Sequence, residues 1–424
     1  MTHSEIGSFP ADWSIHRVDA LFDIQQGKQV SKANRDGDNQ QPFLRTKNVL
    51  WGNIDLSELD QMHFSDKEES RLKLQEGDLL LCEGGDVGRT AIWNARIEDC
   101  YYQNHLHRLR AKNFEDIDPH FALYWFWYAF EVGKLYFGRS NVTTIPNLSQ
   151  SKLGELQMPK PGFAEQRRIA RILSTVQTAI AQQERLLALT GELKATLLRK
   201  LFTEGLRGEP QKMTEIGLVP ESWKMTTLGE IASKPEGIIQ TGPFGSQLHK
   251  HDYQAEGIPV VNPTHFLGNR INHSNLPRIT SATAKRLEKY VLRTGDILFA
   301  RRGEIGRHAV VTERENGWLC GTGSFLVRVN KPWIDNRFLD YLFTIDGIVN
   351  WLSSHAAGVI MPNLNNAILT RMPVPYPSFD LQTEIADCLK TIDKKLGLAT
   401  RKRDFLFELF RTLLHQLMTA QLRV

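Results

Sequence analysis

The 424-residue sequence contains few cysteines, and none of them falls in a pattern that builds a site. Its four cysteines, Cys82, Cys100, Cys320 and Cys388, are widely scattered and form no Cys-x-x-Cys pair. Disulfide frameworks and thiolate zinc sites both depend on recurrent cysteine spacings. Neither is therefore expected, and buried free thiols are the preferred interpretation.

Long apolar runs are also missing. No stretch reaches the roughly 20 residues that a membrane-spanning helix needs, and the first residues lack the apolar core of a secretory signal. A hydrophobic content of 41% and a charged content of 24% are typical of a soluble protein. We expect a cytoplasmic protein that has no membrane partner.

Motifs that carry catalysis are absent as well. There is no phosphate-binding Gly-x-x-x-x-Gly-Lys-Ser/Thr, no Gly-x-Gly-x-x-Gly between a strand and a helix, and no His-Glu-x-x-His. The segment 262–265 (Asn-Pro-Thr-His) matches only part of the Asn-Pro-Pro-Tyr motif of amino-methyltransferases. The pairs His105/His107 and His249/His251 have a spacing that a metal site could use, but no third ligand recurs beside both. The sequence indicates a non-catalytic chain without a metal or cofactor of its own.

What the sequence does contain is a long amphipathic segment that occurs twice, at 163–207 and at 379–424. Apolar residues recur there at steps of three and four, as in a coiled coil. Gln183 and Thr190 interrupt the first series and Arg403 the second; we expect these polar residues to set the register or to meet a partner. The predicted seam consists of Ile169, Leu173, Val176, Ile180, Leu187, Leu193, Leu197 and Leu201, then Ile385, Leu389, Ile392, Leu396, Ala399, Leu406, Phe410, Leu413 and Leu417.

The duplication extends beyond the helices. Residues 200–207 align with 416–423, and the opening motif Glu-Ile-Gly-x-x-Pro-x-x-Trp at 5–13 returns at 215–223. The second copy of this motif directly follows the first long helix, so the residues that open the chain correspond to those that leave a helix. If the end of the chain lies near its beginning, the last helix runs back to the first domain. The two helices would then be antiparallel.

Three further pairs of blocks recur in the same order. The first pair is a β-prone run with a glycine-bearing turn, which ends at Arg89 or Arg307; these arginines are either solvated or in contact with nucleic acid. The second pair is dense in aromatic residues and predicts a buried helix, although base stacking is an alternative. The third is Pro-Asn-Leu. The blocks are 77–91 and 295–309, 121–128 and 338–343, and 146–148 and 362–364.

Charge is slightly positive overall, with a formal net charge of +4 and a pI near 8.7. The segment 163–207 carries eight Lys and Arg against four Asp and Glu, and 379–424 carries eight against six. The remaining 36 basic and 38 acidic residues nearly cancel. Any nucleic-acid surface on the globular parts must therefore be a local cluster.

Polar, basic and glycine-rich loops differ between the two halves of this shared frame. Arg, Lys, Asn and Gln can make the paired contacts that distinguish bases, while Ser, Thr and Lys hold phosphates. Each loop alone could simply be solvated, so the interpretation rests on their recurrence. The predicted DNA contacts are Lys28, Lys32, Arg45, Lys47, Asn48, Arg89, Asn104, His105, Arg139, Asn141, Thr143 and Thr144 in the first half and Gln240, Thr241, Ser246, Lys250, Asn262, His265, Arg301, Arg302, Arg307, Thr322 and Ser324 in the second.

Taken in order, these motifs resemble the specificity subunits of type I restriction and modification systems. The resemblance covers essentially the whole chain. It rests on the repeated Glu-Ile-Gly motif, the Gly-Asp-Leu/Ile-Leu run with its turn, the Pro-Asn-Leu element, and the helix start Glu165-Gln-Arg-Arg-Ile-Ala, which reads Leu-Gln-Thr-Glu-Ile-Ala in the second copy.

The resemblance implies an α/β (α+β) architecture. Two similar mixed α/β target-recognition domains, 1–158 and 209–374, would be separated by a pair of long antiparallel coiled-coil helices, 159–208 and 375–424. It also implies that each domain reads one half of a bipartite, asymmetric site on double-stranded DNA, and that the helices set the unread spacer.

The same resemblance implies the partners. Two methyltransferase subunits would dock on the helices and restriction subunits could join them. S-adenosylmethionine, ATP and Mg²⁺ would then belong to those subunits. Three alternatives stay open: an enzyme that itself cuts or methylates DNA, a duplicated coiled-coil scaffold that binds only protein, and a specificity subunit of a type IIB-like system.

Overall fold

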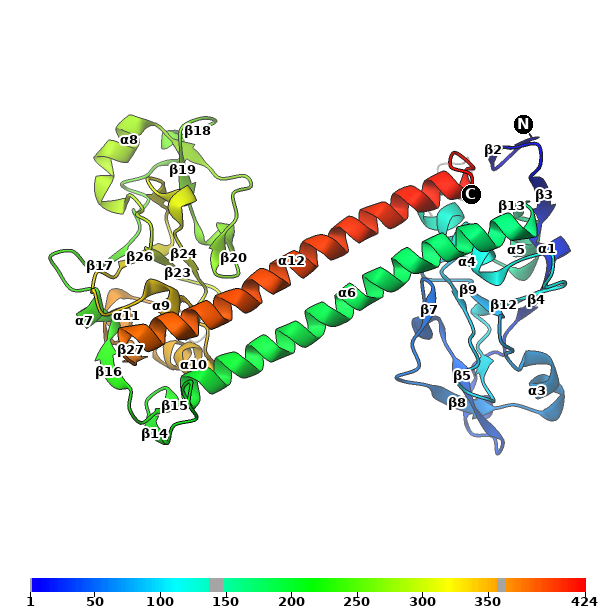
Figure 1. Ribbon diagram of the computed structural model, residues 1–424, viewed down its shortest axis with the longest axis horizontal. Helices are drawn as coiled ribbons and strands as arrows, with labels where there is room; N and C mark the ends of the chain where they lie inside the picture. The colour runs from blue at the N-terminus through cyan, green and yellow to red at the C-terminus, as the bar shows by residue number, and fades with distance from the viewer. Residues whose placement is uncertain (1, 137–147, 357–362) are drawn as a thin grey trace. The chain divides into compact units, whose positions relative to one another are not determined.

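The computed structural model describes residues 2–136, 148–356 and 363–424 (Figure 1). Four predicted DNA contacts, Arg139, Asn141, Thr143 and Thr144, lie outside the described residues. The chain divides into two compact units: unit 1 comprises Met1–Arg185 and Thr400–Val424, and unit 2 comprises Leu186–Ala399. The sequence-based division sets each long helix apart, whereas each compact unit takes part of both helices.

Unit 1 is built on two sheets. The first is antiparallel, in the order β10 (Thr90–Ile92), β9 (Leu79–Cys82), β12 (Leu106–Ala111) and β4 (Phe22–Gln26). The second has the order β11 (Tyr101–Tyr102), β5 (Gln40–Leu44) and β8 (Asp60–His63), with β11 parallel to β5. All of β9 is buried, because Leu79 and Leu81 pack into one hydrophobic cluster while Leu80 and Cys82 pack into another. A strand covered on both faces reads as an unbroken apolar run.

Shorter elements complete unit 1. The aromatic block at 121–128 is the buried helix that the sequence predicts: it begins after Asp118, whose side chain accepts hydrogen bonds from the amides of His120 and Phe121. A π-helical turn, Tyr128–Val132, follows it. The two-stranded ladders are β1 (Thr2–Ser4) with β2 (Gly7–Phe9), β3 (Ser14–Arg17) with β13 (Gln157–Lys160), and β6 (Val49–Leu50) with β7 (Asn53–Ile54); the helices are α1 (Val18–Leu21), α2 (Lys32–Arg35), α3 (Asp66–Leu72), α4 (Pro119–Trp127) and α5 (Gln150–Glu155).

Unit 2 repeats this topology with one additional strand. Its antiparallel sheet has the order β24 (His308–Val310), β23 (Ile297–Ala300), β26 (Ser324–Arg328) and β17 (Ile238–Thr241). Its second sheet again contains one parallel pair, and it adds one strand at the edge. That sheet has the order β25 (Leu319–Cys320), β19 (Ile258–Val261), β22 (Arg278–Ile279) and β18 (Tyr253–Gln254).

The smaller elements of unit 2 also have counterparts in unit 1. The ladders are β14 (Gln211–Thr214) with β15 (Gly217–Pro220), β16 (Lys224–Thr227) with β27 (Pro373–Tyr376), and β20 (Phe266–Leu267) with β21 (Arg270–Ile271). The helices are α7 (Leu228–Ile231), α8 (Ser281–Arg286), α9 (Asn336–Leu342), α10 (Asp346–His355) and α11 (Asn366–Arg371). The duplication inferred from the sequence is therefore confirmed at the level of strand order.

Two long helices, α6 (Phe163–Thr203) and α12 (Phe379–Met418), belong partly to each unit. In unit 1, the start of α6 shares a hydrophobic cluster with the end of α12, and in unit 2 the end of α6 shares one with the start of α12. The two helices are thus antiparallel within each unit, as expected (Figure 1). No helix within the described ranges combines the length and the apolar character that a membrane crossing requires.

Most of the predicted seam is buried or half-buried. Leu193 is the exception, because its side chain is 52% exposed. The seam residues that are buried are Ile169, Leu173, Ile180, Leu201, Ile385, Leu389, Ile392, Ala399, Phe410 and Leu417, and those that are half-buried are Val176, Leu187, Leu197, Leu396, Leu406 and Leu413.

The repeated sequence motifs have structural explanations. In the opening motif, Gly7 (φ 131°) and Gly217 (φ 96°) take the positive φ of a hairpin turn, and a buried tryptophan follows each hairpin. In the Gly-Asp block, Asp78 is fully buried and accepts hydrogen bonds of 2.7 and 2.7 Å from Arg110 Nε and Nη2. Asp296 and Arg328 repeat this paired contact at 2.7 and 2.6 Å.

The helix-start motif contains a buried glutamine in each copy. Gln166 accepts a hydrogen bond from the Asp118 amide at 2.9 Å and donates to two carbonyl groups. Gln382 does the same, with the Asp335 amide at 2.9 Å. Both side chains are 0% exposed. Each glutamine therefore joins the first turn of a long helix to the globular part of its unit.

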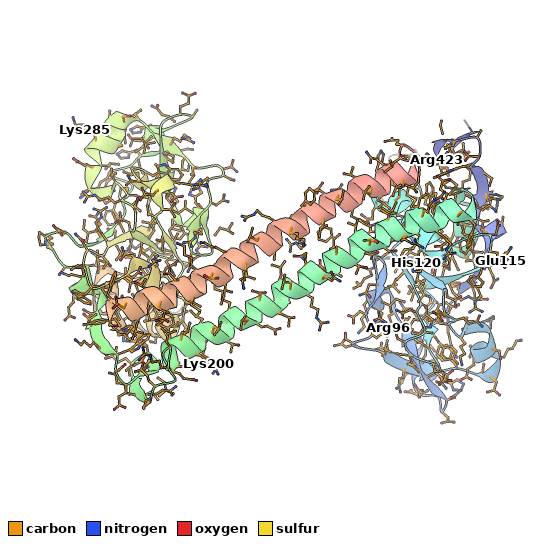
Figure 2. The ribbon with its side chains drawn as sticks, viewed as in Figure 1. Arg96, Glu115, His120, Lys200, Lys285 and Arg423 are labelled. Carbon is orange, nitrogen blue, oxygen red and sulfur yellow. The ribbon has the colours of Figure 1, made fainter. Side chains whose placement is uncertain are left out.

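The end of the chain contacts residues near its beginning, which is the condition under which the sequence makes the two helices antiparallel. Arg423, which is labelled in Figure 2, donates to Glu165 Oε1 at 2.6 Å and to Asp12 Oδ2 at 2.7 Å. Its guanidinium lies over the Trp13 ring. The expectation of buried thiols was wrong for one cysteine. Cys388 is exposed on α12, whereas the other three cysteines are buried and all four are free.

Candidate nucleic-acid interface

A groove of about 590 Å³ lies at the loop ends of the unit 2 sheets. Loops that follow β17, β19, β23 and β25 form its wall, although they are far apart in the sequence. The phenyl ring of Phe244, 51% exposed, lies at its edge. Seven of the predicted contact residues line the groove: Thr241, Asn262, Arg301, Arg302, Arg307, Thr322 and Ser324.

Backbone hydrogen bonds hold these loops together. The Gly321 amide donates to the Val261 carbonyl at 2.9 Å, and the Gly242 amide donates to the Ser324 carbonyl at 2.7 Å. Glycine is required at this crossing, because a Cβ on Gly242 would lie 2.1 Å from the Gly321 carbonyl oxygen. Gly242 and Gly321 therefore allow a close backbone contact between these loops.

Arg301 and Arg302 begin the turn after β23. The Leu364 amide donates to the Arg301 carbonyl at 3.0 Å, and Arg301 Nε donates to Asn363 Oδ1 at 3.2 Å. Asn363 and Leu364 of the repeated element therefore support this turn. Arg302 is exposed, and neither arginine forms an ion pair with any residue that the structure describes. Their terminal guanidinium nitrogens are available to a ligand.

Two buried polar atoms of the groove lack partners. Ser324 is 1% exposed, and its Oγ has no hydrogen-bond partner within the described part of the chain. The same holds for Nε of Arg307, whose Nη2 donates to the Pro263 carbonyl at 2.8 Å. Buried polar groups are normally hydrogen-bonded. The groove is therefore suited to a polar ligand that supplies acceptors.

The other predicted residues of unit 2 lie outside this groove. His265 accepts a hydrogen bond at Nδ1 from the Asn262 amide at 3.0 Å, and burial lowers the pKa of its ring. It therefore shapes the loop as a neutral imidazole. Gln240 donates to the Lys289 carbonyl, while Ser246 and Lys250 are exposed on the following loop.

In unit 1, most of the predicted basic residues already have ionic partners. Lys28 has a side chain that is only 9% exposed; it pairs with Glu68 at 2.7 Å and also donates to the His63 carbonyl. Arg45 pairs with Asp60 at 2.9 Å, and Lys47 pairs at 3.1 Å with a glutamate. The geometry of Lys28 argues against the predicted DNA contact, because its ammonium group is used inside the unit.

Asn48 and Arg89 also have structural roles. Asn48, 2% exposed, donates to two carbonyl groups of its own loop and accepts from the Arg45 amide. Arg89 donates to Asp86 at 2.6 Å and to the Thr46 carbonyl at 2.7 Å. Arg307 bonds to the Pro263 carbonyl in the equivalent turn of unit 2. The two arginines of the repeated block therefore hold neighbouring loops in place.

The remaining predicted residues of unit 1 are Lys32 and His105, which are exposed, and Asn104, which is half-buried.

Glu83 of unit 1 occupies the position that corresponds to Arg301 of unit 2, and the sequence reasoning missed it. It follows β9 as Arg301 follows β23: the Leu148 amide donates to the Glu83 carbonyl at 3.0 Å, and the Glu83 amide donates to the His105 carbonyl at 3.0 Å. The carboxylate is 7% exposed and accepts from Gln26 Nε2 at 3.0 Å. Alignment of the two Gly-Asp blocks already places Glu83 opposite Arg301, so this signal was present in the sequence.

The cysteines and histidines that the structure describes near these loops have structural roles. Burial raises the pKa of Cys82 to about 11 and that of Cys100 to about 12, so both thiols stay protonated. His107 is buried against the Leu148 carbonyl, and His249 stacks on His251. Within the described ranges, no three His, Cys, Asp or Glu side chains lie close enough together to hold a metal ion.

The fold is a duplicated one, and polar loops of unit 2 form a groove. Two matches to the family model of the type I restriction modification DNA specificity domain cover residues 10–189 and 220–406. The chain belongs to this family. It is a type I specificity subunit, which is a DNA-recognition component and not a catalytic one.

Comparisons with individual proteins agree with this assignment. The type I restriction enzyme MjaVIII specificity subunit of Methanocaldococcus jannaschii is 22% identical, across 98% of this chain and 94% of that protein. The EcoBI specificity subunit of Escherichia coli is 24% identical, across 88% of this chain and 77% of its own length. A crystal structure of a type I S subunit from M. genitalium covers 96% of both chains at 19% identity, with a TM-score of 0.60, and supports the fold.

Proposed function

We propose that each unit reads one half of a bipartite, asymmetric site on duplex DNA. The observation that carries this proposal is the groove of unit 2, where loops from four separate segments bring together seven polar residues chosen from the sequence alone. Phosphate contacts would position the unit, and contacts to base edges would supply the specificity.

Arg301 is the proposed base-reading residue of unit 2. Arginine reads guanine by donating two hydrogen bonds to O6 and N7. Arg301 is half-buried and held through Nε by Asn363, so its two terminal nitrogens are pre-oriented. Exposed Arg302 is better placed for a phosphate, because a phosphate contact requires charge more than a fixed orientation.

Glu83 gives unit 1 the opposite chemistry at the equivalent position. A carboxylate accepts hydrogen bonds, and the amino group of cytosine is the base donor that Asp and Glu pair with most readily. Gln26 holds the Glu83 carboxylate at 3.0 Å. Arg301 donates hydrogen bonds at this position in unit 2, whereas Glu83 accepts them at the equivalent position in unit 1. The two halves of the DNA site should therefore differ in sequence.

We infer that methyltransferase subunits dock along the helices. Leu186, Leu189 and Leu193 are 49%, 52% and 52% exposed, and their spacing of three and four places them on one face of α6. S-adenosylmethionine would belong to those subunits, and ATP and Mg²⁺ to restriction subunits that join the complex. We also infer that the complex acts in the cytoplasm, where its DNA substrate is found.

Helix length is proposed to set the spacer between the half-sites. α6 and α12 are continuous over 41 and 40 residues, and each passes from one unit into the other. Inserting one helical turn into both helices should therefore change the preferred spacer. An unchanged spacer in that variant would rule this role out.

The test is selection from a random duplex library by the chain co-expressed with its methyltransferase subunit. Moderate salt is needed, because non-specific phosphate binding dominates at low salt. We expect two short motifs at a fixed separation. Arg301→Ala should relax one motif and Glu83→Gln the other, each by about 1–3 kcal/mol of discrimination, while Lys285→Ala, on exposed α8, should change neither. If a stable complex enriches no sequence, the scaffold function is favoured.

A further inference from the structure

Four aromatic residues form a ladder between the globular part of unit 1 and its long helices. Trp51, in the turn between β6 and β7, stacks on Trp127 at the end of α4, with centroids 5.3 Å apart and planes 15° apart. Trp127 packs on Phe410 of α12 at 4.8 Å, and Phe410 lies 6.0 Å from Tyr124. Through these rings the β6–β7 turn packs, by way of α4, against α12.

Unit 2 keeps only one of these four rings. The duplication places Gly268 at the position of Trp51, Thr344 at that of Trp127 and Lys194 at that of Phe410, while Tyr341 corresponds to Tyr124. The contacts support this correspondence. The ammonium group of Lys194 lies 5.8 Å from the centroid of Tyr341, much as Phe410 lies beside Tyr124 in unit 1.

The missing rings leave a groove of about 500 Å³ in unit 2, between the β20–β21 turn, α9 and α6. Leu267, at the hairpin, is 70% exposed and forms one rim. Ala195 and Leu198 of α6 also line it. Among its lining residues, Asp393 pairs with Lys194 at 2.6 Å and accepts from the Tyr341 hydroxyl at 2.7 Å, so this ion pair is satisfied within the unit.

We propose that this groove binds an aromatic side chain supplied by a protein partner. Unit 1 shows which kind of group fits, because an indole occupies the equivalent position there. The groove contains two carboxylates, Asp340 and Asp393, against two cations, Lys194 and Arg270, and such a balance does not favour a polyanion such as DNA. An aromatic ring would instead contact Leu267 and the alkyl and ammonium groups of Lys194.

This inference rests on the proposed docking of a methyltransferase subunit and adds an anchor to it. Deeply seated aromatic side chains dominate the energetics of many interfaces. Because unit 1 fills the same position with its own Trp51, the anchor exists on one side of the duplication only. The two halves of the chain should therefore hold partner subunits with unequal strength.

The test measures the affinity of the full-length chain for its purified methyltransferase subunit. Leu267→Asp places a charge on the rim, and Gly268→Trp with Asn269→Gly transplants the turn of unit 1, in which Gly52 takes the positive φ of 69°. Both variants should bind the subunit at the unit 2 side at least tenfold more weakly. Met213→Asp is the matched control, because Met213 is also a highly exposed apolar residue of unit 2, at 75%.

The outcomes separate this inference from the proposed function. If the wild-type chain bound no methyltransferase subunit, the proposed docking itself would be wrong. If the wild-type chain and both groove variants bound with equal affinity, the docking would stand and the aromatic anchor would be overturned. An equal loss in Met213→Asp would also overturn it, since the effect would then not belong to the groove. Unchanged thermal unfolding of both variants would confirm that their fold is intact.

Discussion

Replacing Gln166 with alanine should destabilise unit 1 more than any other single change at the start of α6. The side chain is 0% exposed and forms three hydrogen bonds: from the Asp118 amide at 2.9 Å, to the Asp116 carbonyl at 3.1 Å and to the Pro161 carbonyl at 2.9 Å. Alanine would leave one buried donor and two buried acceptors without these partners, and it would also open a cavity.

The magnitude follows from the groups that lose partners. A buried polar group left unsatisfied costs about 1–3 kcal/mol, and a carbonyl tolerates the loss better than an amide. We therefore expect a loss of about 3–5 kcal/mol, a large share of the ~5–15 kcal/mol that stabilises a typical domain. Gln382→Ala should cost a similar amount in unit 2, because its three hydrogen bonds measure 2.9, 3.0 and 3.0 Å.

Amide hydrogen exchange combined with urea unfolding is the suitable assay, since the two units need not unfold together. Gln166→Ala should accelerate exchange in α4, and Gln382→Ala in α9, each without affecting the other unit. Gln182→Ala, at an exposed position of α6, is the control and should change stability by less than about 0.5 kcal/mol. Gln166→Leu separates the lost hydrogen bonds from the cavity. A loss below 1 kcal/mol in both alanine variants would refute the reasoning.

Three further predictions follow from single contacts. Arg423→Ala should lower the thermal stability of unit 1 and return the depressed pKa of Asp12 towards its ordinary value, whereas Arg411→Ala, at an exposed position of α12, should do neither. Burial alone would raise the pKa of Glu68, but hydrogen bonds, led by that from Lys28, lower it from 4.5 to about 2. Its stabilisation is therefore present above pH 4.5 and lost towards pH 2, and Glu68→Gln should flatten the acid unfolding curve of unit 1 over that range. Arg302→Ala should weaken DNA binding uniformly across sequences and reduce the slope of log affinity against log salt by about 1; an altered preferred base would contradict its assignment to a phosphate.

Several features of this protein could be predicted because they depend on local pattern. The heptad spacing of Ile169, Leu173 and Ile180 predicts a long helix without any knowledge of what the helix packs against. The same spacing at 379–424 indicates the duplication. The aromatic block at 121–128 is too apolar for a surface helix, and the structure buries it. The Glu-Ile-Gly motif requires a residue that accepts positive φ, and Gly7 and Gly217 supply one.

Tertiary structure decided which of the polar loop residues share a site. Thr241, Asn262, Arg301 and Thr322 meet because the pairing of β17, β23 and β26, and of β19 with β25, brings distant segments to one end of unit 2. No periodicity in the sequence encodes such non-local pairing. The sequence also does not show which residue pairs with a charged side chain. From the sequence, Lys28 is a loop lysine open to solvent, but in the structure it forms an ion pair with Glu68 at 2.7 Å.

By itself, therefore, the sequence determined the duplication, the long helices, the non-catalytic class and the family, because these depend on repetition and on short-range spacing. Only the tertiary structure decided that seven of the predicted residues form one groove and that the Glu83 side chain is buried and bonded to Gln26. It also decided that unit 2 has a groove at the position that Trp51 fills in unit 1. The physical reason is that burial, charge pairing and the space between side chains depend on residues that the chain brings together from far apart.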